Sequence, residues 1–418
     1  MRIYAASHVL PVSSPPLEGG ALAVQNGRIV AVGTLSELTA AFSAPVSEFP
    51  GCAIIPGLVN AHSHLELTHF PSWKIRKGID FSPRTYTDWV IQVIKISRCL
   101  TRQEREQSLL EGIRICMESG TTAVGEIVSS PGLLNFYRLS PLAGRLYFEA
   151  IGQDPLQCDD LLTLLGETVA GFGETGLQPG ISPHASHTLS SAFCSDVVKL
   201  AERLSVPLAV HLAESRAELE FLFDSTGPIA EKLYPFAGWD DYLPPPRRTS
   251  PTAYLDSLGV LRPGTVAAHC VHITPYDAEI LKARGVAVVL CPRSNDKLDV
   301  GTAPVRLMKK AGIPLALGTD SLASNDSLSL LDEARFLLER FAGDFTPDEA
   351  LRLITLSGAE VIGMSSEVGS LEPDKRGDFL VVSLPESLGS RKLPDAIIEQ
   401  GKLLEVFAGG DQLGIGGL

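Results

Sequence analysis

The chain has 418 residues, and its hydrophobic share of 44% and charged share of 20% are ordinary for a folded globular protein. This length can bury a large core and predicts one large domain with a smaller accessory one. The net charge of −14 argues against a nucleic-acid partner, because phosphate binding needs a clustered basic face. No apolar run approaches the ~20 residues of a membrane span, so no membrane partner is expected.

The N-terminus and the cysteines bear on cellular location. Residues 1–10 lack the apolar segment of a secretory signal, so secretion is not expected. The seven cysteines are scattered without CxxC spacing, which predicts reduced core thiols and a cytoplasmic location. Cys270 and Cys291 lie beside apolar strand residues, and we expect both to pack in the core.

Taken in chain order, the elements fall into three parts. Residues 1–55 alternate short β runs with turns and are predicted to be all-β, with a hairpin at Asn26-Gly27. Residues 56–365 switch to alternating strand and helix patterns, as βα units require. Residues 366–418 return to β character and are expected to complete the small domain that the N-terminus begins.

The middle part predicts a (β/α)8 TIM barrel, and the two chain ends together predict a small β-sandwich, so the fold class is α/β. The eight candidate strands end near His64, Glu126, Gly152, His184, His211, His269, Ser294 and Asp320. Helical patterns cover Arg102 to Glu118, Ser191 to Leu204, Pro275 to Arg284, Ala303 to Ala311 and Ser327 to Phe341. The proline-rich stretch 243–251 is predicted to be a loop above the barrel mouth, and the glycine-rich stretch 409–417 a loose terminus.

Metal-ligand residue types recur at the predicted strand ends. His62-Ser63-His64 ends one apolar run, and alternation along a strand aims both imidazoles at the same side. His211, His269 and Asp320 each follow another short apolar run. Two such rings can hold one metal ion, and the other side chains are expected at the C-terminal ends of barrel strands, which carry the chemistry of this fold.

These motifs resemble the amidohydrolase superfamily. The segments that carry the resemblance are Pro56 to His64, His211-Leu212-Ala213-Glu214, Ala268-His269-Cys270-Val271-His272 and Gly318-Thr319-Asp320-Ser321. Within the superfamily they are similar to the branch of cytosine deaminases, S-adenosylhomocysteine deaminases and triazine hydrolases. The flanking segments His64 to Thr68, Tyr86 to Val90 and Cys291 to Asn295 look most like the aminofutalosine deaminases of the alternative menaquinone route.

The resemblance implies a ligand set for one divalent transition metal per chain, Zn²⁺ or, in some relatives, Fe²⁺. The implied ligands are His62, His64, His211 and Asp320. Relatives with two metals bridge them through a carboxylated lysine on the fourth strand, and this chain has no lysine from Ile96 through Val198. A single metal that lowers the pKa of a bound water is therefore expected.

The resemblance also implies catalytic and substrate-binding residues. Glu214 corresponds to the proton shuttle, and His269 to the histidine that hydrogen-bonds the attacking hydroxide, with Asp320 as a further proton acceptor. His184 matches a histidine that contacts the substrate. Glu66 is weighed between substrate recognition and a structural role, and Arg293 between a substrate carboxylate and a surface salt bridge.

The sequence thus predicts a hydrolytic deaminase of an amino-substituted heteroaromatic ring, with an adenine nucleoside such as aminodeoxyfutalosine as substrate. Other amidohydrolase reactions on triazines, guanine, cytosine or S-adenosylhomocysteine would use the same core. A catalytically silent binding or assembly protein is the remote alternative, and the presence of every ligand argues against it. The roles of His187 and His272, the pathway and the oligomeric state, a homodimer among the options, are left open.

Overall fold

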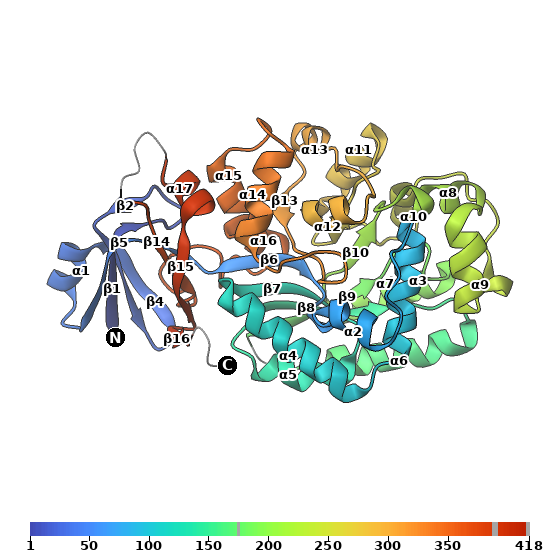
Figure 1. Ribbon diagram of the computed structural model, residues 1–418, viewed down its shortest axis with the longest axis horizontal. Helices are drawn as coiled ribbons and strands as arrows, with labels where there is room; N and C mark the ends of the chain where they lie inside the picture. The colour runs from blue at the N-terminus through green and yellow to red at the C-terminus, as the bar shows by residue number, and fades with distance from the viewer. Residues whose placement is uncertain (174–175, 387–391, 415–418) are drawn as a thin grey trace.

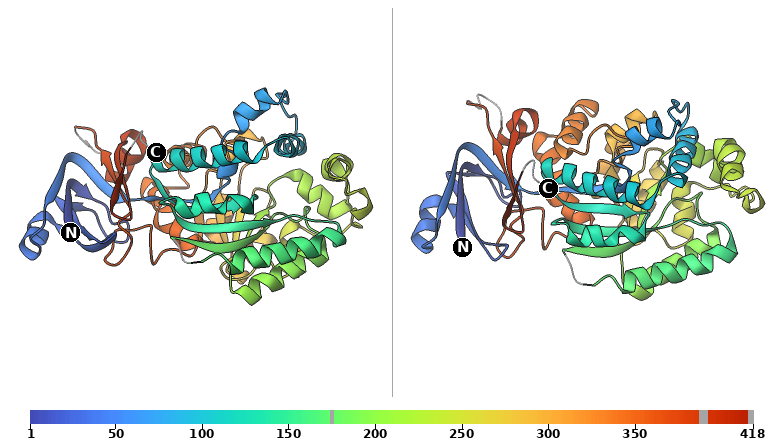
Figure 2. Two further views of the ribbon diagram at one scale, coloured as in Figure 1. Left: turned by 90° about the horizontal axis from the view of Figure 1, so that it is seen from below. Right: turned by 60° about the horizontal axis from the view of Figure 1, so that its bottom comes forward.

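The computed structural model describes residues 1–173, 176–386 and 392–414. Figure 1 shows a twisted sheet at one end of the molecule, where the first strands of the chain lie beside the last ones. The rest of the chain forms a larger body of strands and helices, and the two turned views in Figure 2 show the same division. Both ends of the chain therefore meet in the smaller part.

The smaller part is one continuous sheet. Its strands are β1 (Arg2–Val9), β2 (Leu17–Glu18), β3 (Gly20–Gln25), β4 (Arg28–Thr34), β5 (Val46–Pro56), β14 (Phe379–Ser383), β15 (Lys402–Ala408) and β16 (Asp411–Leu413). In the described part of the chain they follow the order β16-β15-β14-β5-β1-β3-β4, with β2 paired to β1. The predicted hairpin is confirmed: Gln25 faces Arg28, and Asn26 and Gly27 have φ values of 51° and 76°.

This sheet curls so that its two ends face each other across an apolar core. The rings of Phe379 and Phe407 stack with centroids 4.2 Å apart, and the Tyr4 ring lies 4.9 Å from each. Leu22 and Ile29, from the opposite end of the sheet, belong to the same buried cluster. The predicted β-sandwich is thus made by one folded-over sheet, and the C-terminal strands contribute Phe379, Val381 and Phe407 to its core.

Two predictions for the chain ends are wrong. The predicted all-β segment contains a helix, α1 (Leu35–Ala41), which begins at a capping box formed by Thr34 and Glu37. The predicted loose tail contains β16, which pairs with β15 as an added edge strand. Such pairing depends on a neighbouring strand and leaves little local signal, and residues 415–418 lie outside the described residues.

The larger part is a parallel β-barrel. Its strands are β6 (Leu58–Ser63), β7 (Thr121–Val128), β8 (Ala143–Ala150), β9 (Leu177–Pro183), β10 (Ala209–Leu212), β11 (Val266–His269), β12 (Ala287–Leu290) and β13 (Leu315–Leu317). Parallel ladders join β6 through β9 and β10 through β13. Bridges Ile181–Leu208 and Ser63–Asp320 close the two halves into a ring. The predicted (β/α)8 barrel is confirmed.

Helices surround this barrel, and local sequence signals locate several of them well. The predicted bounds match those of α4 (Arg102–Glu118), α7 (Ser191–Leu204) and α11 (Pro275–Arg284), while α13 (Val305–Ala311) and α14 (Leu330–Arg340) are shorter than expected. The other helices are α2 (Phe70–Arg76), α3 (Tyr86–Arg98), α5 (Leu134–Leu139), α6 (Pro155–Ala170), α8 (Arg216–Asp224), α9 (Tyr234–Ala237), α10 (Pro251–Ser257), α12 (Pro292–Lys297), α15 (Pro347–Leu353), α16 (Leu356–Val361) and α17 (Leu393–Gln400). Short helical turns are η1 (Leu65–Leu67), η2 (Pro131–Leu133), η3 (Ile229–Leu233) and η4 (Asp240–Tyr242).

Prolines explain two differences in the barrel. The seventh strand was expected to end near Ser294, but β12 ends at Leu290 and Pro292 begins helix α12, so Ser294 is helical. The predicted loop at 243–251 is irregular up to Ser250, and Pro251 then begins α10. Proline at the first helical position has a favourable φ and loses no hydrogen bond there, so it starts these helices.

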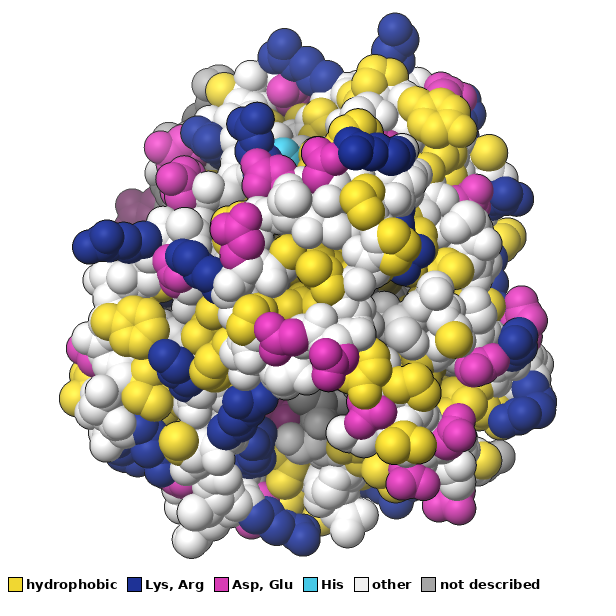
Figure 3. All heavy atoms as spheres, turned by 90° about the vertical axis from the view of Figure 1, so that its right-hand side faces the viewer, with side chains coloured by type: hydrophobic (Ala, Val, Ile, Leu, Met, Phe, Trp, Pro, Cys, Tyr) yellow, Lys and Arg dark blue, Asp and Glu magenta, His cyan; other side chains and the backbone are white. Residues whose placement is uncertain are grey.

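Among the described residues, no helix has the length and apolarity needed to cross a membrane. On the face that Figure 3 shows, acidic and basic side chains are interspersed. All seven cysteines are free and six are buried, as predicted, but Cys99 is exposed.

The curled core yields a stability prediction. Phe379 is fully buried between Tyr4 and Phe407, so Phe379→Ala should lower the free energy of unfolding by about 3–5 kcal/mol, measured by chemical denaturation. Leu156→Ala, at a side chain that is 86% exposed, is the control and should change it little. If Phe379→Ala lowered the free energy of unfolding no more than Leu156→Ala does, this core would not stabilise the fold.

Candidate active site

The first and last strands of the barrel are joined directly beside the predicted metal ligands. The Asn60 amide donates to the Thr319 hydroxyl at 2.7 Å, and the Thr319 backbone N–H donates back to Asn60 Oδ1 at 3.1 Å. The Asp320 N–H donates to the His62 carbonyl at 3.0 Å. A Cβ at Gly318 would lie 2.8 Å from His62 backbone atoms, so only glycine allows this approach.

Four predicted ligands converge at this joint. His64 Nε2 and His211 Nε2 are 3.2 Å apart, and the ligand nitrogens of His62, His64 and His211 all lie within 4.8 Å of one another. Asp320 Oδ1 is 3.5 Å from His64 Nε2 and 3.8 Å from His62 Nε2. The structure therefore brings together the whole ligand set expected from the sequence.

Hydrogen bonding shows that this set suits a cation. His211 Nδ1 lies 3.0 Å from the His184 carbonyl, which can only accept, so Nδ1 carries the proton and Nε2 offers its lone pair to the centre. His62 Nε2 is buried and has no hydrogen-bond partner. Burial, together with the neighbouring His64, lowers the pKa of His62 well below its usual value, so its imidazole is neutral. Three imidazoles and one carboxylate fit a divalent zinc ion.

The carboxylate of Asp320 is held in its charged form. The hydroxyls of Ser294 and Ser324 donate to Oδ2 at 2.7 and 2.6 Å, which leaves Oδ1 facing the histidines. Burial opposes ionisation, but His64 and the other histidines hold the pKa of Asp320 at about 2. Asp320 is therefore a ready anionic ligand.

Glu214 lies beside this centre and is held on two sides. The Tyr86 hydroxyl donates to Glu214 Oε2 at 2.8 Å, and Glu218 Oε2 accepts the Glu214 backbone N–H at 3.0 Å. Glu214 Oε1 lies 3.8 Å from His269 Nε2. Burial raises the pKa of Glu214, while His269 and Tyr86 oppose that rise. A carboxyl with a raised pKa suits proton transfer near neutral pH.

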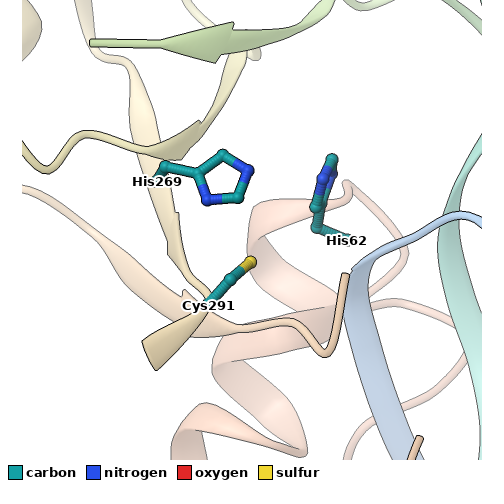
Figure 4. Close-up of side chains that lie close together, drawn as sticks. All are labelled: His62, His269 and Cys291. Atoms are coloured by element: carbon teal, nitrogen blue, oxygen red, sulfur yellow. The ribbon is translucent and has the colours of Figure 1, made fainter. Parts of the chain in front are cut away.

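His269 faces the same space. Its Nδ1 lies 2.9 Å from Asn295 Oδ1, which orients the ring and leaves the buried Nε2 without a hydrogen-bond partner. Burial alone would lower the pKa of His269, but Glu214, Asp320 and Asn295 together raise it. Figure 4 shows the His269 ring, the His62 ring and the Cys291 thiol directed toward one another.

Cys291 was expected to be a core residue, and its position is more specific than that. Its sulfur lies within 4.8 Å of the ligand nitrogens of His62 and His269, on the floor of the site. Burial and the nearby Asp320 raise the pKa of the Cys291 thiol well above its usual value. Burial thus favours the protonated thiol over the thiolate, which is the form that binds metals.

The backbone is strained where these side chains leave their strands. Ala213, His269, Cys270 and Asp320 have φ values of 47°, 70°, 50° and 57°, in the left-handed region that non-glycine residues rarely adopt. Each such residue costs about 1–3 kcal/mol unless its surroundings impose it, and such outliers cluster at functional sites. The strain lies at three of the strand ends that form the site.

A buried carboxylate supports the His62-Ser63-His64 turn from behind. Glu126 accepts hydrogen bonds from the Ser63 hydroxyl, the Leu65 N–H and the Tyr137 hydroxyl. Burial raises the pKa of Glu126 to about 8. The bonds from Ser63 and Leu65 tie Glu126 to the residues on both sides of His64, and Tyr137 holds the Glu126 side chain in place.

The residues expected to bind substrate take different positions. The His184 ring lies 4.7 Å from the His211 ring, its Nδ1 is 3.0 Å from the Thr188 hydroxyl, and its Nε2 is 3.8 Å from Glu149 Oε1. Glu66 is buried in η1, and only one of its carboxylate oxygens has a partner, the Ser130 N–H. Burial raises the pKa of Glu66.

Arg293 lies against α14. Its guanidinium is 3.9 Å from carboxylate oxygens of Asp332 and Glu333, which gives it protein partners of its own. His187 is buried, and burial lowers its pKa to about 3, so it is neutral. His272 Nε2 lies 2.7 Å from the Val300 carbonyl, which is a structural contact.

Sequence reasoning missed the residues that orient the site. Tyr86, Glu218, Asn295 and Ser324 contact Glu214, His269 or Asp320 from other elements. The spacing of Ser215 and Glu218, typical of a helix N-terminus, offered a signal for Glu218. Tyr86 and Asn295 lie in segments that carry the family resemblance, but their partners, like that of Ser324, are set only by the folded chain.

Comparison with known proteins gives the family. A model described as the amidohydrolase family matches residues 53–413, and one described as an imidazolonepropionase-like composite domain of bacteria matches residues 20–42. The 5-methylthioadenosine/S-adenosylhomocysteine deaminase of Moorella thermoacetica is 31% identical over 90% of this chain and 84% of its own. The aminodeoxyfutalosine deaminase of Deinococcus radiodurans is 29% identical over 82% of this chain and 81% of its own.

A solved structure agrees with these relatives. An adenosine deaminase from Xanthomonas campestris with bound zinc superposes with a TM-score of 0.82 at 26% identity, covering 98% of this chain and 92% of that one. The family match covers the barrel and the C-terminal strands together, and it includes each of the four converging ligands. The chain belongs to the amidohydrolase family.

Proposed function

We propose that this hydrolase is a zinc-dependent deaminase of an amino-substituted heteroaromatic ring, with an adenine nucleoside as substrate. The observation that carries the proposal is the placement of Glu214, within 3.8 Å of His269 and beside four converging donors for one metal. The relatives named as deaminases of adenine nucleosides support the choice of ring. A silent binding protein would not need this complete set.

The reaction adds water to the ring carbon that carries the amino group and releases ammonia, so one C–O bond forms and one C–N bond breaks. When bound, zinc lowers the pKa of a water molecule from about 16 toward about 7 and so supplies the nucleophile. Glu214 takes one proton of the water at Oε1 and delivers it to the ring nitrogen, where it stays. Asp320 accepts the second proton from the hydroxyl added to the ring carbon, and that proton passes to the departing amine, which leaves as ammonia. His269 Nε2 and Asp320 Oδ1 orient the attacking oxygen toward the ring carbon.

The finer proposal concerns the substituent of the nucleoside. We keep aminodeoxyfutalosine, an adenine nucleoside that bears a benzoate, as the first candidate, which would place the enzyme in menaquinone biosynthesis. The relative from Deinococcus radiodurans supports it. His184 and Glu66, near the metal ligands, are proposed to contact the nucleoside. Arg293 would have to leave Asp332 and Glu333 to bind the benzoate.

A substrate panel tests this function. Ammonia release should be fastest with one of the adenine nucleosides, namely aminodeoxyfutalosine, 5-methylthioadenosine, S-adenosylhomocysteine or adenosine. Guanine, cytosine and a chlorinated triazine complete the panel and should react at least tenfold more slowly. Faster turnover of any of these three would overturn the adenine assignment, while a poor rate with aminodeoxyfutalosine alone would overturn only the finer proposal.

Metal content gives the second test. Elemental analysis should find about one zinc ion per chain, and His62→Ala or Asp320→Ala should lose both the ion and turnover. Cys291→Ser is the matched control beside the same site and should keep the ion, because the thiol does not belong to the His62, His64 and His211 group that the proposed ion would occupy. Two tightly bound ions per chain would contradict the single-metal site.

Glu214 provides the third test. Glu214→Gln removes the proton shuttle without changing the size of the side chain, so kcat should fall by about 10²–10⁴-fold while zinc content stays the same. Glu220→Gln, at an exposed carboxylate on α8, the helix that follows Glu214, is the control and should keep wild-type kcat. If Glu214→Gln turned over at the wild-type rate, another residue would have to move the proton.

A further inference from the structure

The helix that carries Tyr86 is fastened to the barrel at two points close to the site. Asp88 Oδ1 accepts from Lys232 Nζ at 3.1 Å, which ties α3 to η3. The Trp89 indole N–H donates to the Ala323 carbonyl at 3.1 Å, three residues after Asp320. Tyr86 is the first residue of α3, so these two contacts hold its ring over Glu214.

The Tyr86 hydroxyl engages one of the two Glu214 oxygens. It donates to Oε2 at 2.8 Å, while Oε1 points to His269 Nε2 at 3.8 Å. Glu218, on α8, holds the Glu214 backbone N–H. The Tyr86 phenol therefore contacts one oxygen of the Glu214 carboxylate and the His269 imidazole faces the other. The two oxygens are not equivalent.

We propose that Tyr86 is a positioning residue for the proton transfer: it occupies Glu214 Oε2 and so assigns Oε1 to carry the proton between the attacking water and the ring. This inference rests on the proposed function, because it requires Glu214 to be the shuttle. A carboxylate free to rotate would present either oxygen at varying distances, and orientation of reacting groups contributes strongly to rate. The tyrosine also prevents Oε2 from competing with Oε1 for the same proton.

A double-mutant cycle tests the proposal. Tyr86→Phe removes only the hydroxyl, and it should lower kcat about 10- to 100-fold, as expected for loss of a hydrogen bond to a charged group, with KM and zinc content nearly unchanged. In the Glu214→Gln background the same substitution should change kcat less than about twofold, because the residue on which Tyr86 acts is already disabled. Tyr276→Phe, at an exposed tyrosine, is the control and should leave kcat unchanged.

The outcomes separate the positioning role from other roles and from the proposed function itself. The best adenine nucleoside of the substrate panel serves as the probe. An equal loss from Tyr86→Phe in both backgrounds, or a loss confined to KM, would overturn positioning and make Tyr86 a substrate contact or a packing residue. Wild-type kcat in Tyr86→Phe would also overturn it. Wild-type kcat in Glu214→Gln would instead refute the shuttle, and with it the proposed function of Glu214.

Discussion

The closure of the barrel between β6 and β13 is the constraint on which the site depends. The reciprocal bonds of Asn60 and Thr319, and the bond from the Asp320 N–H to the His62 carbonyl, join the two ends of the ring. Because His62 and His64 come from the end of the first strand and Asp320 follows the last one, these three ligands meet only when this joint forms. The metal site therefore forms when the barrel closes, and a bound cation would stabilise both.

The joint is in turn supported from outside the barrel. β5 ends at Pro56, directly before β6, and the Gly57 N–H donates to the Asp378 carbonyl at 3.0 Å. β14, which begins at Phe379, pairs with β5. The small sheet, which is built from both ends of the chain, thus fixes the start of β6, the strand that leads to His62 and His64. The pairing of the two chain ends therefore helps to position the site.

Buried carboxylates organise the ring of loops around the centre. Glu126 holds the turn at His64, Glu218 holds the backbone of Glu214, and Glu333 accepts from the Asn325 amide near Asp320. Burial raises the pKa of Glu126 and Glu333 to about 8 and that of Glu218 to about 7, whereas Asp320 stays near 2. The contrast follows from their surroundings, because only Asp320 faces several imidazoles. The acids that support loops therefore keep a proton up to a higher pH than the acid that would bind metal.

Local sequence determined the barrel, the bounds of α4, α7 and α11, and the metal-ligand residue types, because caps, periodicity and strand-end positions lie within short segments. Only the tertiary structure decided what those residues contact. Tyr86 reaches Glu214 across 128 positions, and Asn295 reaches His269 across 26. The charge of Arg293 is compatible with a substrate carboxylate or a surface salt bridge, and only the fold places its guanidinium beside the carboxylates of Asp332 and Glu333 on α14. Contacts between distant segments depend on how helices pack on the barrel, and no pattern within one segment encodes that packing.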